Sequence, residues 1–314
     1  MRALLVFWAA VLILLSGGAA ALQVMGPLRT PVLPVVAEPA PALGWDGRIA
    51  RPDPALLEPD AAHPPNMLPR VGRDGRLPRQ VYARPAPARD GRPRVALLLA
   101  GFGLSEADSR AAAALPGPVS LAVSAYARAA DPMVEAARAA GHELLASVPM
   151  EPERLGVDDP GPLALLTGAP PAANQARLEQ VMGRFQGYAG LTGVSDGLVG
   201  GRFAGQPSGM SQLTAEVGRR GLFWVDPRPR GAEPPTADMP GPAVDIVLDE
   251  GDPPSRAGIE GRLAALERLA RQRGAALGVA VRLRPVTLEL VGAWARDAEA
   301  RGIVLVPVSN LVAP

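Results

Sequence analysis

The sequence predicts an α/β fold in which parallel strands are joined by crossover helices. After Arg94, short apolar runs alternate with stretches of helical periodicity seven or eight times. Each apolar run has the length of a buried strand. The runs are residues 95–100, 119–124, 143–148, 190–194, 222–226, 244–248, 276–281 and 303–308.

Two of the intervening segments have a clear helical pattern, because their apolar residues recur at near-helical spacing. These residues are Ile259, Leu263, Leu266 and Ala270 in the first segment, and Leu290, Val291, Trp294 and Ala298 in the second. The number of strands favours a closed or nearly closed barrel over an open sheet, although the pattern alone fits both.

The N-terminus predicts export from the cytoplasm. Residues 3–22 carry no charge and are strongly apolar. Twenty helical residues span about 30 Å, which is the thickness of the bilayer's hydrocarbon core. The small residues Ala19, Ala20 and Ala21 are also typical of a cleavage site. Residues 1–22 are therefore expected to be a signal peptide or an uncleaved membrane anchor, and either places the rest of the chain outside the cytoplasm.

A proline-rich stretch follows the hydrophobic segment. Fifteen of the 36 prolines lie between Leu22 and Arg94. Proline at this density favours extended conformations and disfavours helices and sheets. We therefore expect three parts: the hydrophobic segment, a disordered spacer at residues 23–93, and a single α/β domain at residues 94–314.

Composition excludes several classes of function. The net charge is only +1, so nucleic acid is not an expected partner, because binding phosphates requires a clustered basic surface. The chain has no cysteine and no lysine, which removes thiolate metal sites and a lysine nucleophile. The predicted domain contains one histidine, His142, so a zinc site with two or three histidines is not expected. No cofactor is predicted.

Charged residues after the predicted strands are the candidate ligand-binding residues. Asp226 and Glu151 follow strands at their carboxyl ends, where barrel active sites gather, and Asp249 follows the run 244–248. Asp196 and Arg202 lie in a glycine-rich loop. The alternative is that each of the five is a solvated loop charge.

The order of the motifs resembles the divergent polysaccharide deacetylase family from residue 94 to residue 312. The similar stretches are VALLL at 95–99, VSLAVSAYA at 119–127, GHELLASVPMEP at 141–152, GPLALLTG at 161–168, RF at 202–203, GLFWVD at 221–226, DIVLD at 245–249 and GIVLVPVS at 302–309. The resemblance implies a distorted (β/α) barrel of the polysaccharide deacetylase and glycoside hydrolase type, with a cleft that faces carbohydrate.

The chain departs from the family pattern where the resemblance implies the metal site. The family's Asp-Asp pair corresponds to Ala100 and Gly101, and one of its histidines corresponds to Ser147. A second histidine falls on Leu198, or on Gly197 if the register shifts by one, and a later Gly-His-Pro falls on residues 281–283. The metal ligands that the resemblance implies are therefore absent, and no metal is predicted.

Three functions remain open. In the first, the domain is an envelope pseudoenzyme that binds cell-wall glycan or a partner protein and has lost metal-dependent hydrolysis. In the second, it is an active deacetylase or hydrolase whose carboxylates hold a hard cation such as Mg²⁺ or Ca²⁺. In the third, it is a structural envelope protein that docks another protein. The membrane is a further partner through residues 3–22 if that segment is not cleaved.

Overall fold

The computed structural model describes residues 46–128, 130–229, 241–251 and 253–312. The chain divides into two units, residues 1–38 and 39–314. The hydrophobic segment 1–22 and spacer residues 23–45 lie outside the described residues. None of the described helices is both long and apolar enough to cross a membrane. All described residues belong to the second unit.

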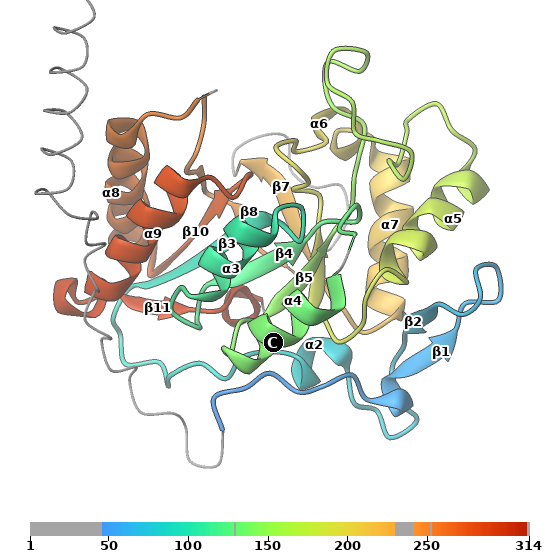
Figure 1. Ribbon diagram of the computed structural model, residues 1–314, viewed down its shortest axis with the longest axis horizontal. Helices are drawn as coiled ribbons and strands as arrows, with labels where there is room; N and C mark the ends of the chain where they lie inside the picture. The colour runs from blue at the N-terminus through green and yellow to red at the C-terminus, as the bar shows by residue number, and fades with distance from the viewer. Residues whose placement is uncertain (1–45, 129, 230–240, 252, 313–314) are drawn as a thin grey trace, which may run out of the picture. The chain divides into compact units, whose positions relative to one another are not determined.

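A parallel sheet forms the centre of the fold (Figure 1). Within the described residues its strands are β3 (Arg94–Phe102), β4 (Ser120–Val123), β5 (Leu144–Ser147), β6 (Gly190–Thr192), β7 (Phe223–Pro229), β8 (Ala243–Val244), β9 (Ile246–Val247), β10 (Ala275–Ala280) and β11 (Val304–Val306). They pair in the order β8-β7-β6-β5-β4-β3-β10-β9, and β11 pairs with the first residues of β3.

The sheet closes into a nearly complete barrel through Asp245. β8 pairs with β7 at one end of the sheet and β9 pairs with β10 at the other, yet only Asp245 separates β8 from β9 in the chain. The Asp245 backbone N–H donates to Leu277 O at 2.9 Å, and its Oδ2 accepts from Leu277 N at 2.9 Å. The predicted strand 244–248 is therefore two short strands that join the two ends of the sheet. The predicted distorted (β/α) barrel is confirmed.

Helices cover the outside of the barrel. They are α3 (Glu106–Ala113), α4 (Ala130–Ala139), α5 (Pro171–Met182), α6 (Gly201–Ala204), α7 (Pro207–Arg219), α8 (Arg256–Arg273) and α9 (Pro285–Asp297), and the 3-10 helices η2 (Glu299–Arg301) and η3 (Val308–Leu311) follow. α8 packs on β10 and β3, whereas α5 and α7 pack near β5 and β7 (Figure 1). The first helical pattern predicted from the sequence lies in α8, and the second lies in α9 except for Ala298, which follows its last residue.

Alternate residues of β3 contribute to two apolar cores. Val95, Leu97 and Leu99 belong to the cluster that includes the buried faces of the helices. Ala96 and Leu98 belong to a second cluster with residues of neighbouring strands, which fills the barrel interior. This alternation follows from the two-residue period of a strand. It explains why the strand is continuously apolar in sequence, since it is buried on both faces.

The predicted spacer is wrong for residues 46–93, which we call the N-terminal segment. It contains η1 (Pro54–Leu56), the antiparallel pair β1 (Leu57–Pro59) and β2 (Met67–Pro69), and α2 (Pro78–Val81). Pro54 and Pro78 begin their helices, where the missing N–H costs nothing. Ile49, Leu56 and Tyr82 are buried in the barrel-interior cluster.

The N-terminal segment covers the floor of the barrel, which we define as the amino-terminal ends of its strands. The Ile49 N–H donates to Arg138 O in the last turn of α4, which precedes β5, and the Arg79 N–H donates to Gly221 O just before β7. Arg84 Nη1 donates to Gly141 O at 2.8 Å. Isolated apolar residues between prolines therefore pack against the barrel, although they show no periodicity in sequence.

Candidate functional site

The carboxyl-terminal ends of the strands, which we call the mouth, surround a pocket of about 250 Å³. The loops after β3, β4, β5 and β6 supply its walls. The lining residues are Leu104, Tyr126, Pro149, Met150, Asp159, Pro160, Gly161, Pro162, Gly193, Ser195, Asp196 and Leu198. Most of these side chains are apolar, and Asp196 and Asp159 are the carboxylates among them.

Asp196 is held in an unusual conformation. Its φ of +51° lies in the left-handed region, which non-glycine residues rarely adopt. Ser124 Oγ donates to Asp196 Oδ2 at 3.0 Å and Ser195 Oγ donates to the same atom at 3.2 Å. Oδ1 is buried without a hydrogen-bond partner among the described residues. Burial raises the pKa of this carboxyl, and the two serine hydroxyls oppose the increase.

Tyr126 fixes the wall opposite the β6 loop. Its hydroxyl donates to Pro160 O at 2.7 Å and accepts from the Leu163 N–H at 3.1 Å. Gly161 has a φ of +78°, and a Cβ there would lie 2.5 Å from the tyrosine oxygen. Only glycine therefore lets this loop approach the ring so closely.

Glu151 and Arg202 form an ion pair beside the pocket. Arg202 Nε lies 3.0 Å from Glu151 Oε1, and the glutamate side chain is 5% exposed. Thr167 donates twice to Glu151 Oε2, from its backbone N–H at 2.6 Å and from Oγ1 at 2.8 Å. The carboxylate therefore ties the loop after β5 to the loop before α5 and to α6. Neither partner lines the pocket, although Met150, the neighbour of Glu151, does.

Asp249 supports the loop that carries Asp196. Its two carboxylate oxygens accept from the N–H groups of Val281 and Arg282, at 2.8 and 3.0 Å. In turn, Val281 O accepts from the Gly197 N–H at 2.9 Å. Burial raises the pKa of Asp249, and the two backbone donors oppose the increase. Asp249 therefore acts on the pocket through the backbone after β10.

Asp226 pairs with Arg228 inside β7. Arg228 donates to both carboxylate oxygens, with Nη2 to Oδ2 at 2.9 Å and Nε to Oδ1 at 3.1 Å. The aspartate side chain is buried and is not part of the pocket lining. Of the five residues proposed from sequence, the structure thus places Asp196 in the pocket wall, Asp249 behind it, the Glu151–Arg202 pair beside it, and Asp226 in a separate ion pair.

Sequence reasoning missed Ser124, Tyr126 and the loop at 159–162. Ser124 directly follows β4, so the rule that identified Asp226 applied to it as well. Tyr126 lies two residues further on, in a stretch that carries the family resemblance. The loop at 159–162 has no comparable signal, because its place in the pocket depends on the distant contact with Tyr126.

The residues at the positions of the implied metal ligands do not fit a metal. Ala100 and Gly101 offer no side-chain donor, and Leu198 contributes an apolar wall to the pocket. Ser147 is buried at the end of β5, and its Oγ has no hydrogen-bond partner among the described residues. A lone neutral hydroxyl is a poor ligand for zinc, which prefers imidazole and thiolate. Across the described ranges, no group of three or more His, Cys, Asp or Glu side chains could hold a metal ion.

The one histidine of the barrel lies near its floor. His142 is fully buried just before β5. Its Nδ1 lies 2.7 Å from Val119 O and its Nε2 lies 3.1 Å from Ala113 O. These contacts join the ends of α3 and α4 to the start of β4, which is a structural role.

The fold and the pocket define this chain as a (β/α) barrel protein with a ligand-sized hollow at the mouth. Residues 97–312 match the model of the family described as divergent polysaccharide deacetylase, and the chain belongs to that family. The family predicted from the sequence is confirmed.

Three solved structures are similar to this chain. An uncharacterized protein from Agrobacterium tumefaciens C58 is 33% identical, with a TM-score of 0.71 over 79% of this chain and 100% of that one. A putative cellobiose-phosphate cleavage protein from Enterococcus faecalis V583 is 14% identical, with a TM-score of 0.50 over 70% and 100%. A family 4 carbohydrate esterase from Streptomyces lividans is 12% identical, with a TM-score of 0.40 over 69% and 92%. No curated protein matches the chain.

Proposed function

We propose that this protein binds a sugar of cell-wall glycan in the mouth pocket and does not hydrolyse it through a metal-bound water. Membership of a polysaccharide deacetylase family supports carbohydrate as the ligand class. The donor set at Ala100, Gly101, Ser147 and Leu198 argues against metal-dependent hydrolysis, because that route requires a bound metal ion that lowers the pKa of its water.

The observation that carries the proposal is Asp196 in the pocket wall. A buried carboxylate oxygen without a donor is costly, and such unsatisfied groups and left-handed residues concentrate at binding sites. A sugar hydroxyl is a donor of the kind that Asp196 lacks. Tyr126, Leu104 and Leu198 offer apolar surface against which the C–H groups of a sugar ring pack. The pocket's volume suits one sugar ring or its substituent rather than a long chain.

We also propose that the protein works outside the cytoplasm, either secreted or held at the membrane by residues 3–22. The uncharged apolar sequence of that segment supports this location. We expect activity from a reporter that functions only outside the cytoplasm when it is fused after Arg94. Activity from a reporter that folds only in the cytoplasm would refute the location.

Titration calorimetry with N-acetylglucosamine oligomers tests the binding proposal. Asp196→Gly removes the carboxylate and keeps the left-handed backbone, so affinity should fall at least about tenfold, as for a lost hydrogen bond to a charged group. Asp297→Asn, on the exposed end of α9, is the matched control and should bind like the wild type. Unchanged affinity in Asp196→Gly contradicts the proposal. Chelator-sensitive acetate release from the wild type would contradict the absence of metal-dependent hydrolysis.

A second candidate function is docking of an envelope protein at the mouth. Leu104, Leu155 and Val157 are the exposed large hydrophobic residues of the described chain, and Val157 is 75% exposed. Leu104 lines the pocket, and the other two lie in the loop that also supplies residues 159–162. A Leu155→Asn, Val157→Asn double variant separates the two functions. It should leave binding of the sugar oligomers unchanged, and a loss of that binding would show that the exposed apolar residues belong to the sugar site.

A further inference from the structure

A second cavity, of about 510 Å³, lies at the floor, at the opposite end of the barrel from the mouth pocket. We call it the floor cavity. It lies beside the amino-terminal ends of β3, β8 and β10. Four arginines line it together with one carboxylate: Arg89, Arg92, Arg94, Arg273 and Asp245. The other lining residues are Gly91, Gly241, Pro242, Gly274, Ala275, Ala276, Asn310 and Leu311.

Arg94 is the buried charge of this cavity. The residue is only 5% exposed. Its Nη1 donates to Asn310 Oδ1 at 2.6 Å and its Nη2 donates to Pro87 O at 2.8 Å. Both acceptors are neutral, and no carboxylate within the described ranges pairs with this guanidinium. Since a guanidinium carries five N–H donors, donors remain for a ligand.

The other arginines differ in how far their charge is neutralised. Arg92 pairs with Asp90 at 2.7 Å, and Arg273 pairs with Asp245 at 3.1 Å. Arg89 is exposed and makes no ion pair with a described residue. Burial of Arg94 lowers the pKa of its guanidinium from the ordinary value, and the positive charge of Arg89 lowers it further. Two cations that repel each other thus lie at one cavity, and a bound anion would relieve both the repulsion and the burial cost.

The cavity is also open to a ligand. Gly91 and Gly274 line it with φ values of +84° and +83°, and a Cβ added at either would meet no atom within 4 Å. The carboxylate of Asp245 does not compete for the free donors, because its oxygens accept from Arg273 and from the Leu277 N–H. The floor cavity is therefore large enough for a phosphate group and for a sugar attached to it.

We propose that the floor cavity binds a phosphate group, either free or carried on a sugar, and that Arg94 and Arg89 are the residues that contact it. A guanidinium presents a planar fork of donors that matches two oxygens of a phosphate. The buried Arg94 gives the site its geometry, and the exposed Arg89 adds the second positive charge. This site is separate from the mouth pocket and does not depend on glycan binding there.

Titration calorimetry with the full chain at constant ionic strength tests the proposal. The probes are inorganic phosphate and glucose 6-phosphate, with glucose as the neutral control. Arg89→Gln should weaken binding about tenfold, the scale of a lost charge-assisted contact, and should not lower the melting temperature. Arg73→Gln is the matched control, since Arg73 is also exposed and without a described contact but lies outside the cavity. Arg94→Lys keeps the charge and removes the fork, so it should weaken binding while the protein remains folded.

The outcomes separate the sources of the phosphate. Equal affinity for both probes assigns the site to the phosphate group alone, whereas tighter binding of glucose 6-phosphate assigns it to a phosphorylated sugar. Saturable binding that Arg89→Gln weakens and Arg73→Gln does not is the expected result. The proposal is overturned if neither probe binds saturably, or if the two variants weaken binding equally.

Discussion

The two ends of the barrel differ in how their buried polar groups are satisfied. Near the floor, the carboxylate of Glu143 is fully buried and accepts from the N–H groups of Arg84 and Ser309 and from Ser120 Oγ. Burial raises its pKa, but its donors come from three separate parts of the chain. At the mouth, Asp196 Oδ1 and Ser147 Oγ have no donor or acceptor in the described structure.

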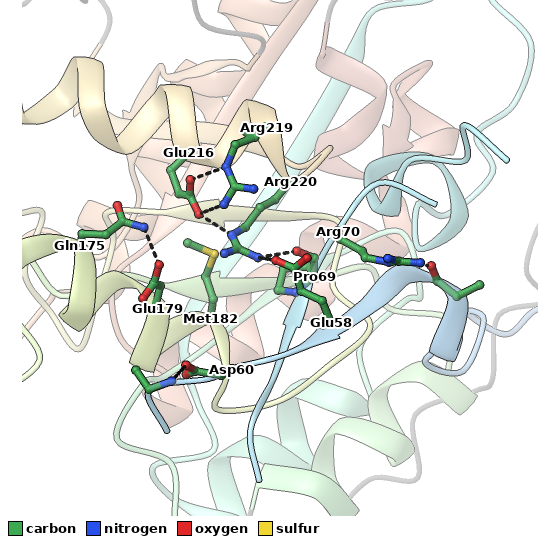
Figure 2. A network of polar contacts seen from close by, with 12 residues as sticks. Glu58, Asp60, Pro69, Arg70, Gln175, Glu179, Met182, Glu216, Arg219 and Arg220 are labelled. Atoms are coloured by element: carbon green, nitrogen blue, oxygen red, sulfur yellow. Dashed lines mark hydrogen bonds and ion pairs between the residues drawn. The ribbon is translucent and has the colours of Figure 1, made fainter. Parts of the chain in front are cut away.

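This difference supports the proposal that the mouth binds a ligand, whereas the contacts of Glu143 near the floor stabilise the fold. Satisfied networks fix a structure, whereas unsatisfied groups are tolerated where a ligand completes them. Figure 2 shows the floor network around Arg220, which precedes β7 and ties α7 to the β1–β2 pair. The floor cavity departs from this pattern, because Arg94 is buried against neutral acceptors and no carboxylate in the described ranges pairs with it.

The largest expected effect is that of removing the N-terminal segment. A chain that begins near Arg92 loses the buried side chains of Ile49, Leu56 and Tyr82, each of which contributes about 1.5–3 kcal/mol by burial alone. The truncated chain should lose its cooperative thermal transition, measured by circular dichroism. A transition close to that of the longer chain would show that residues 46–93 are a spacer after all.

A matched pair of arginine substitutions compares the two ends directly. Arg220 is 3% exposed and contacts Glu216, Glu58 and the Pro69 carbonyl, whereas Arg202 is 56% exposed and contacts Glu151. Arg220→Gln removes the donor to the Pro69 carbonyl and the link between Glu58 and Glu216, although Arg219 still pairs with Glu216, so the free energy of unfolding should fall by about 1–3 kcal/mol. Arg202→Gln should cost less than about 1 kcal/mol, because Thr167 still satisfies Glu151. Urea denaturation measures the free energy of unfolding of both variants. Equal losses of stability would contradict the proposed difference between the floor and the mouth.

The smallest expected effect is a pH dependence at Asp196. Because burial raises its pKa in the folded state, the folded protein binds this proton more tightly than the unfolded chain does. The charged form therefore destabilises the protein above the folded-state pKa, and that penalty disappears as pH falls toward the ordinary value of 3.8. Asp196→Asn should be more stable than the wild type at neutral pH, and the gap in melting temperature should narrow on acidification. A gap that widens on acidification would mean that the pKa is lowered.

The barrel could be predicted from the sequence because its strands are buried on both faces. Each apolar run therefore marked a strand, and only the break at Asp245 was hidden, since it depends on hydrogen bonds to Leu277. The N-terminal segment was mispredicted because Leu56 and Tyr82 lie singly among prolines, and their burial comes from contacts distant in sequence. At the mouth, the glycine-rich loop pointed to Asp196. The donors from Ser124 and the wall built on Tyr126 required the fold.

Hydrogen–deuterium exchange with and without an N-acetylglucosamine oligomer tests the central claim most directly, because it reports on the mouth and the floor at once. The account predicts slower exchange in the β4 and β6 loops around Tyr126 and Asp196 and in the loop at 159–162, with no change in the N-terminal segment. The Asp196→Gly variant should lose this protection. Protection confined to the N-terminal segment, or equal protection in wild type and variant, would contradict the assignment of sugar binding to the mouth.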